Sequence, residues 1–234
     1  IADISASSIS LSGLNLTITG TNFLVYAGGV EYTKSTETIA VTNTVGIHYV
    51  YYAAATGVLT QSTSFDIVDD ALVALLYIDD TGAVTVFGEE RHGILMDGMT
   101  HKYLHATVGT RWASGLGLVS NALASGAPAA NGANTYVSMS GGIIYDEDLQ
   151  HTIVAGVGAG RFEQDLGGTL PANPGKLPVL YKNGAGAAWR KRTVDSFPFP
   201  WNVSGNIPQY NQFTGGAWQL TNVPTTNFFV VWLF

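Results

Sequence analysis

Three histidines, which are the residues best suited to chemistry, lie in one stretch of the chain, residues 89–110. They are His92, His101 and His105, of five histidines in all. His101 and His105 are four residues apart, so on a helix both imidazoles would lie on one face. With a carboxylate such as Asp97 they form a donor set suited to zinc or iron, or to acid–base chemistry. The sequence therefore makes His101, His105 and Asp97 the candidate metal ligands, with His92 close by.

Two other interpretations of this stretch stay open. In one, neutral rings stack between copies of the chain, and three-fold symmetry would bring histidines from three copies to one axis, where they can trap a metal. In the other, the stretch is a short helical turn or irregular crossover whose polar groups satisfy buried backbone. The crossover is favoured because Lys102 follows His101 where the HExxH pattern needs its base, and because the chain has no cysteine. We therefore expect no catalytic residue and no cofactor, a metal at the histidines excepted.

Acidic residues elsewhere offer weaker candidates. Asp146 and Asp148 could pair as acid and base in a glycan hydrolase, with Glu89 as a further candidate. Consecutive acids on a strand point to alternate faces, however, so residues 146–148 should not all serve one site. Asp79 and Asp80 lack the spacing of a calcium loop and are typical of a turn.

An aromatic and proline-rich stretch follows later in the chain. It contains Phe197, Phe199 and Trp201, with prolines that fix the backbone and keep the stretch out of a central strand. If exposed, these rings would stack on sugar rings or bind a neighbouring chain. They are the candidate ligand-binding residues.

The composition indicates an assembled protein. Charged residues make up 12% of the 234 residues, about half of the usual ~25%, and the mean hydropathy is +0.20. Such a weakly charged surface is often buried against neighbours. The net charge of −7 argues against nucleic acid as a partner, since the basic run at residues 190–192 is too short for phosphate binding. No run of ~18 apolar residues occurs, so no membrane insertion is expected.

Short strands and tight turns dominate the pattern. Apolar or alternating segments at residues 23–26, 46–52, 73–78 and 178–182 are each bounded by Gly, Asn or Asp turn signals, and no long segment has a helical period. We expect an all-β fold of antiparallel hairpins forming one or two β-sandwich-like domains, with little helix. The predicted parts are an N-terminal arm or hairpin (1–37), a first β domain with the histidine-rich crossover (38–105) and a second β-sandwich domain (106–234). Because both ends look cut, we expect the natural chain to continue.

Several stretches resemble a family of uncharacterised phage virion proteins. They are Gly-Ile-His-Tyr-Val-Tyr-Tyr at 46–52, the histidine-rich residues 90–105, and Pro-Gln-Tyr-Asn-Gln-Phe-Thr-Gly-Gly-Ala-Trp-Gln-Leu at 208–220. The resemblance covers roughly residues 41–234, and its histidine-rich part is the most specific. It implies a structural, non-catalytic component of the phage particle, in a tail fibre or appendage and assembled as a trimer. It carries over no catalytic residues.

The expected partners are therefore further copies of the chain, other virion proteins and a host surface glycan. The alternatives are a capsid decoration or head fibre protein and a carbohydrate-binding, receptor-binding module. A glycan hydrolase is the least favoured of the functions considered. The expected location is the extracellular phage particle.

Overall fold

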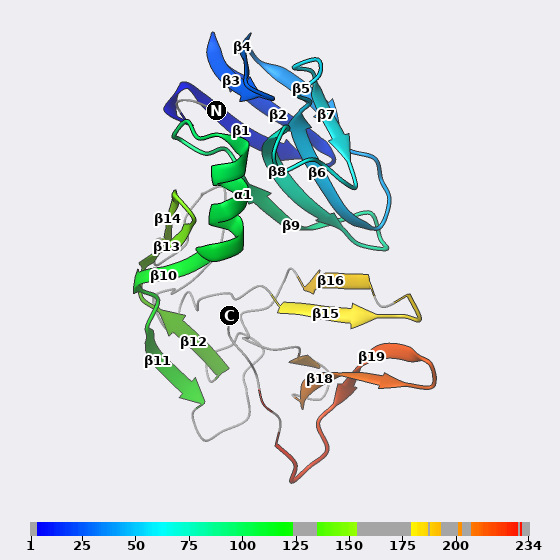
Figure 1. Cartoon of the computed structure of the whole chain (residues 1–234). Helices are drawn as coiled ribbons and strands as arrows, with labels where there is room; N and C mark the ends of the chain where they lie inside the picture. Colours follow the sequence, from blue (N-terminus) through cyan, green and yellow to red (C-terminus); the bar gives the residue numbers. More distant parts are fainter. Residues whose placement is uncertain are drawn as a thin grey trace. The chain divides into compact units, whose positions relative to one another are not determined.

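A computed structural model describes residues 4–123, 135–153, 179–186, 188–192, 201–202, 207–228 and 230 (Figure 1). The described residues form short strands, one α-helix and one 3-10 turn. In chain order these are η1 (Ile4–Ala6), β1 (Ser7–Ser12), β2 (Asn15–Gly20), β3 (Phe23–Ala27), β4 (Val30–Lys34), β5 (Glu37–Ala40), β6 (Gly46–Tyr52), β7 (Leu59–Ser62), β8 (Ala71–Ile78), β9 (Val84–Glu89), α1 (Gly98–Thr107), β10 (Thr110–Gly115), β11 (Leu118–Leu123), β12 (Thr135–Met139), β13 (Gly142–Asp146), β14 (Leu149–Ile153), β15 (Val179–Asn183), β16 (Ala188–Arg192), β17 (Trp201–Asn202), β18 (Ile207–Thr214) and β19 (Ala217–Asn222).

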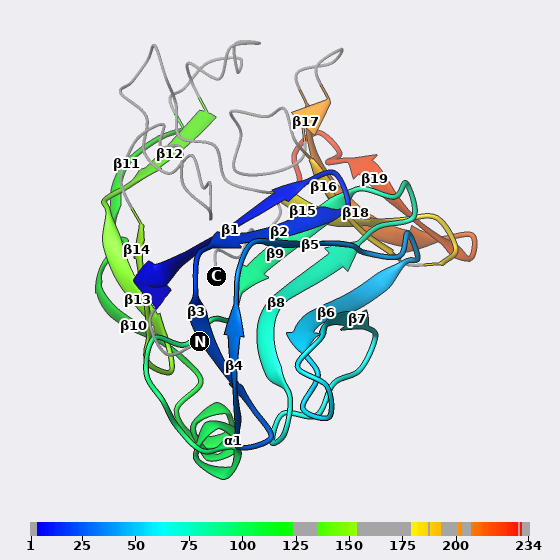
Figure 2. The same ribbon diagram turned by 90° about the horizontal axis from the view of Figure 1, so that it is seen from above.

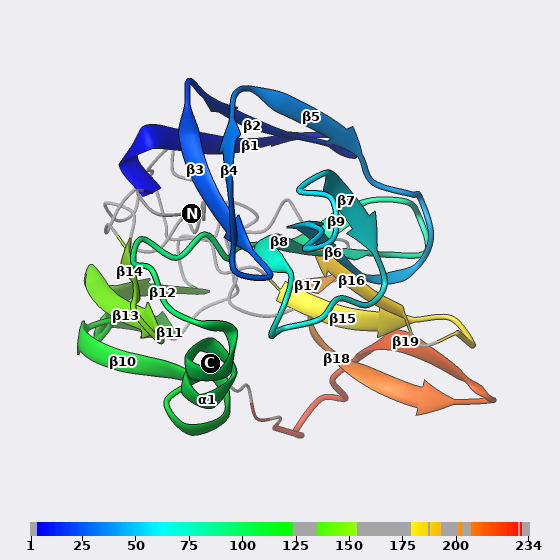
Figure 3. The same ribbon diagram turned by 45° about the horizontal axis from the view of Figure 1, so that its top comes forward.

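The chain divides into two compact units. The first comprises residues 1–113 and 144–151, and the second comprises residues 114–143 and 152–234. In the first unit, β7-β6-β8-β9 is a four-stranded antiparallel sheet whose strands lie side by side in Figure 2. β1-β2-β5 forms a three-stranded sheet, and β3 pairs with β4 in a separate hairpin, which Figure 3 shows beside it.

The pattern of apolar residues explains which faces of the central strands β6 and β8 are buried. His48, Val50 and Tyr52 occupy the buried face of β6, as the period of two predicts. β8 is buried along most of its length, as expected of an apolar strand that pairs with β6 on one edge and β9 on the other. The His48 ring is fixed by the Thr44 carbonyl, 2.8 Å from Nε2, and so serves the core.

Two turns show why the hairpins form where the sequence places them. Gly28 and Gly29 join β3 to β4 with φ values of 56° and 76°, a left-handed pair that favours glycine. After β8, the Asp79 carboxylate accepts hydrogen bonds from Thr81 and from the Ala83 amide. The interpretation of Asp79–Asp80 as a turn is therefore confirmed.

One apolar core joins the N-terminal strands to the rest of the first unit. Fully or almost fully buried side chains from β1, β2 and β3 pack with those of β6 and β8: Ile9, Leu16, Ile18, Phe23, Val25, Val50, Tyr52, Val73, Ala74, Leu76 and Ile78. From the sequence, residues 1–37 are predicted to form a separate arm or hairpin. In the structure these strands have no core of their own, because their apolar faces are buried against β6 and β8.

The second unit contains three small sheets among its described residues. They are β11-β12, β15-β16 and β17-β18-β19, and the neighbouring strands in each are antiparallel. β10, β13 and β14, most of whose residues belong to the first unit, form a three-stranded sheet. The all-β prediction is thus confirmed, while the sandwich-like packing of the sheets stays a prediction. In the part of the chain that the structure describes, no helix is long and apolar enough to cross a membrane.

Candidate metal centre

Helix α1 places two of the predicted residues together. It spans Gly98–Thr107, so His101 and His105 lie one turn apart on one face, and their Nε2 atoms are 2.9 Å from each other. The sequence favours a short helical turn or irregular crossover here, whereas the observed helix has ten residues. None of them is buried, which explains why the apolar pattern gave no helical period.

Asp97 has a different position from the one predicted. It is the N-cap of α1, and its carboxylate accepts hydrogen bonds from the Thr100 amide at 3.0 Å and the Thr100 hydroxyl at 2.7 Å. These hydrogen bonds lower the pKa of Asp97, with the one from the hydroxyl contributing most. The structure therefore does not bring Asp97 to the histidines, because its oxygens satisfy the first turn of the helix.

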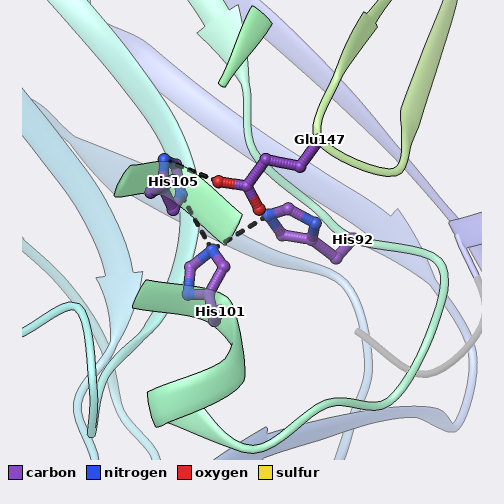
Figure 4. A group of neighbouring side chains, drawn as sticks. All are labelled: His92, His101, His105 and Glu147. Atoms are coloured by element: carbon purple, nitrogen blue, oxygen red, sulfur yellow. Dashed lines mark hydrogen bonds and ion pairs between the residues drawn. The ribbon is translucent and has the colours of Figure 1, made fainter. Parts of the chain in front are cut away.

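The third histidine comes from the segment that follows β9. His92 Nε2 lies 3.1 Å from His101 Nε2, so His101 stands between the other two rings (Figure 4). His92 is one of the three histidines of residues 89–110. The structure thus joins all three of these histidines in one cluster.

Glu147 completes the group from a remote part of the sequence. It lies at the turn between β13 and β14 with φ of 53°, its side chain is 0% exposed, and its Oε1 is 2.9 Å from His105 Nδ1. One donor atom from each of His92, His101, His105 and Glu147 lies within 4.8 Å of all the others. Figure 4 shows the carboxylate facing the three rings. We call these four residues the histidine cluster.

Residues 146–148 do not all serve one site, as expected, but the reason differs from the predicted alternation along a strand. The expectation assumed a strand, whereas Glu147 and Asp148 form a hairpin turn, which points both side chains at the histidine cluster. Asp146, the last residue of β13, instead accepts a hydrogen bond from the Thr110 hydroxyl. The only sequence signal for Glu147 was a run of three acids at a strand end.

Each imidazole has an oxygen atom close to its Nδ1 atom. Two of these oxygens accept hydrogen bonds, Asp148 Oδ1 at 2.5 Å from His92 and the Ile67 carbonyl at 3.3 Å from His101, and the third, Glu147 Oε1, makes a 2.9 Å contact with His105. A carbonyl or carboxylate oxygen accepts and does not donate, so the ring hydrogen belongs on Nδ1. In the neutral rings, all three Nε2 atoms then carry lone pairs. Metal-binding histidines are oriented in this way.

Burial shifts the pKa values of several groups in and near the histidine cluster. Desolvation, followed by the neighbouring His92 and His105, lowers the pKa of His101 to about 4, and desolvation also lowers the pKa of His105. Desolvation, followed by Asp146 and Asp148, raises the pKa of Glu147 to about 7. Glu90, one residue after β9, has its pKa raised to about 7 by burial and by Asp146, Glu147 and Glu89. The region thus contains two imidazoles with lowered pKa values next to two carboxyl groups with raised pKa values.

Two neighbouring features complete the environment. Arg91 is fully buried and contacts Glu89 and the Ser7 hydroxyl. Its guanidinium group therefore links β1 to the end of β9. A cavity of about 540 Å³ has His92 and His101 in its wall, together with Glu90. The side chain of His105 is 29% exposed, so solvent reaches the cluster.

The predicted aromatic site lies largely beyond the described residues. Phe197 and Phe199 are outside them. Trp201 is the first residue of β17 and pairs with Pro208 across the sheet, and only its backbone is described.

Comparison with family models, with curated proteins and with solved structures finds no match to this chain.

Proposed function

We propose that this chain is a structural, non-catalytic protein of an assembled particle, and specifically a component of a phage virion that associates with copies of itself. The phage assignment rests on the resemblance of residues 41–234 to phage virion proteins. The all-β architecture and the low charge of the chain are compatible with it. A tail fibre or appendage is the preferred position in the particle, with a capsid decoration or head fibre protein as the alternative.

A set of exposed apolar side chains at α1 carries the self-association part of the proposal. Met99 and Tyr103 are each 64% exposed and lie one turn apart, on the face of α1 opposite His101 and His105. Ile94 and Leu95, in the segment before the helix, are 57% and 59% exposed and border the same cavity as Met99. We call Ile94, Leu95, Met99 and Tyr103 the apolar face.

Contact of these apolar side chains with water is energetically unfavourable. Grouped apolar side chains on a soluble protein mark an interaction surface more often than single scattered ones do. A second copy of the chain is the proposed occupant, because charged residues are few in the chain and because the resemblance implies a homotrimer.

The mass of the chain in solution tests this proposal. Sedimentation velocity over a range of micromolar concentrations should show a concentration-dependent oligomer, with a trimer as the expected end point. The double variant Met99→Lys/Tyr103→Lys should weaken association at least tenfold. Val58→Lys is a matched control, because Val58 is 55% exposed and lies outside the apolar face. A wild-type chain that stays monomeric, or equal effects of both variants, would overturn it.

A carbohydrate-binding role is the second candidate, and it rests on aromatic residues of the second unit. Trp189 and Phe213 are 43% and 57% exposed, and Lys182 Nζ lies 4.9 Å from the centre of the Trp189 ring and 5.2 Å from that of Trp218. Exposed aromatic rings beside a hydrogen-bond donor suit the apolar face and hydroxyls of a sugar. A glycan array should show binding that Trp189→Ala removes, and a blank array would dismiss this candidate.

A further inference from the structure

We propose that this chain binds one divalent cation of the zinc class through Nε2 of His92, His101 and His105 and the carboxylate of Glu147. The site is separate from the assembly proposed above and does not depend on it. All four donors come from one chain, so no symmetry-related copy is needed to complete it.

The direction of the ring nitrogens is the first argument. Because an oxygen atom lies at the Nδ1 side of each ring, a ring that carries its hydrogen on Nδ1 directs a bare lone pair from Nε2 toward the other two. His101 Nε2 lies 3.1 Å from His92 Nε2 and 2.9 Å from His105 Nε2. Lone pairs at such separations repel each other. A cation shared among them turns this repulsion into three favourable bonds.

The spacing of the donor atoms is close to that of a metal coordination sphere. Four donors at ~2.0–2.1 Å from a tetrahedral zinc ion lie ~3.4 Å apart. The observed spacings of 2.9 and 3.1 Å are within about half an ångström of that value, a difference that small rotations of the rings can supply.

The charge around the cluster is the second argument. The Glu147 side chain is completely buried, and neither of its oxygens accepts a well-formed hydrogen bond, although Oε1 faces His105 Nδ1. Glu90 Oε2 is also buried without a hydrogen-bond partner. Buried carboxyl groups are costly unless a positive charge compensates them, and a dication beside Glu147 supplies that charge.

The chemical types and the number of the donor atoms indicate which metal would bind and whether the site is structural or catalytic. Three imidazole nitrogens and one carboxylate oxygen suit zinc and its neighbours in the first transition row, whereas magnesium and calcium prefer oxygen donors. Four protein ligands make a closed tetrahedral set, which is typical of structural rather than catalytic zinc. Asp148 and the Ile67 carbonyl then act as positioning groups that hold the rings of His92 and His101.

Competition for zinc against a chromogenic chelator tests the site. The metal-free wild-type chain should take up one equivalent of zinc, and cobalt(II) in its place should give the intense visible bands of tetrahedral coordination. His101→Gln should lower zinc affinity by more than 100-fold, because a ligand counts for more than the ~10–100-fold of a residue that orients one. His151→Gln is the matched control, since His151 lies on β14 and is not part of the cluster.

Asp148→Asn separates a binding effect from a folding effect. The substitution keeps the size of the side chain while weakening its hydrogen bond to His92, so zinc affinity should fall ~10–100-fold with an unchanged far-UV circular dichroism spectrum. Wild-type protein without stoichiometric zinc uptake would overturn the proposal, as would equal zinc affinities of wild type, His101→Gln and His151→Gln. Zinc uptake of one ion per three chains would also overturn it, because the four donors would then not belong to one chain.

Discussion

The β core of the first unit and the region around α1 are held in different ways. In the core, side chains such as Leu16, Phe23 and Leu76 are almost completely buried, and removal of apolar surface from water stabilises the packing of three sheets. Helix α1 has no buried residue and is only ten residues long, a length that is marginal for a helix in water. Polar contacts of His101 and His105 join it to His92, to the Ile67 carbonyl and to Glu147.

Burial of apolar surface therefore stabilises the β core. Hydrogen bonds, and metal coordination when a cation is bound, stabilise the region around α1. The histidine cluster connects three segments: the residues after β9, helix α1 and the β13–β14 turn. Without a cation, these connections rest on hydrogen bonds and on the contact between His105 and Glu147. With a cation, three distant segments share one set of metal bonds. The account therefore predicts that the core and the α1 region respond to different perturbations.

The largest expected effect is a core truncation that leaves the metal site intact. Phe23→Ala should reduce the free energy of unfolding by about 3–5 kcal/mol, because it removes a buried ring and leaves a cavity. Chemical denaturation measures the loss. The loss should be the same with zinc and with chelator, since distant sites are additive. Val86→Ala, at a position 40% exposed, should have a small effect. A zinc-dependent loss in Phe23→Ala would contradict the separation of the two regions.

Zinc removal should give the next largest effect, on the α1 region. At a free zinc concentration 100 times Kd, binding stabilises the folded chain by about 2.7 kcal/mol. Chelation should therefore lower the unfolding midpoint in wild type and in His151→Gln, and leave His101→Gln unchanged. Amide hydrogen exchange should increase first in α1 and the β13–β14 turn, while β6 and β8 stay protected. Uniform loss of protection would refute this localisation.

Gly98→Ala should disturb α1 through its backbone packing. A Cβ atom at Gly98 would lie 1.8 Å from the Val68 carbonyl oxygen, so the helix or the segment next to Ile67 must shift. Overpacking of this kind costs about 1–3 kcal/mol. Zinc affinity should fall with it, because Ile67 also holds the His101 ring. Gly93→Ala is the matched control, since its Cβ would meet Ile4 at an ordinary 3.5 Å. Equal zinc affinities in both variants would contradict this link.

The smallest expected effect is proton release on metal binding. Burial raises the pKa of Glu147 to about 7, so at pH 7 roughly half of the carboxyl groups carry a proton, and a metal ligand must lose it. Zinc binding at pH 7 should therefore release about half a proton from this group, fewer at higher pH and more at lower pH. Calorimetry in two buffers of different ionisation enthalpy measures the release. Glu147→Gln should remove this contribution, and an unchanged release would exclude Glu147 as a ligand.

The sequence was sufficient for the features that depend on local pattern. Alternation located the buried face of β6, the continuous apolar run located β8, and the Gly28–Gly29 pair located a hairpin. The i, i+4 spacing of His101 and His105 predicted their common face. These signals are short-range, because each depends on backbone period or on a residue that tolerates an unusual φ.

The rest of the site depends on contacts that one sequence does not contain. Glu147 reaches His105 through the pairing of β13 with β14 and a left-handed turn, and no spacing rule connects the two residues. Asp97 had the right residue type for a ligand, but its position just before the helix favours a cap. The N-terminal strands were predicted to be an arm because their own pattern cannot show which surface covers their apolar face.

The most direct test of the central claim is native mass spectrometry of the wild-type chain, desalted and then mixed with a small excess of zinc. The spectrum gives the number of chains and the number of zinc ions in each species at once. The account predicts one zinc ion per chain in every oligomer, and none bound specifically in His101→Gln. Zinc-free chains, or one ion per oligomer regardless of its size, would contradict an intrachain centre formed by His92, His101, His105 and Glu147.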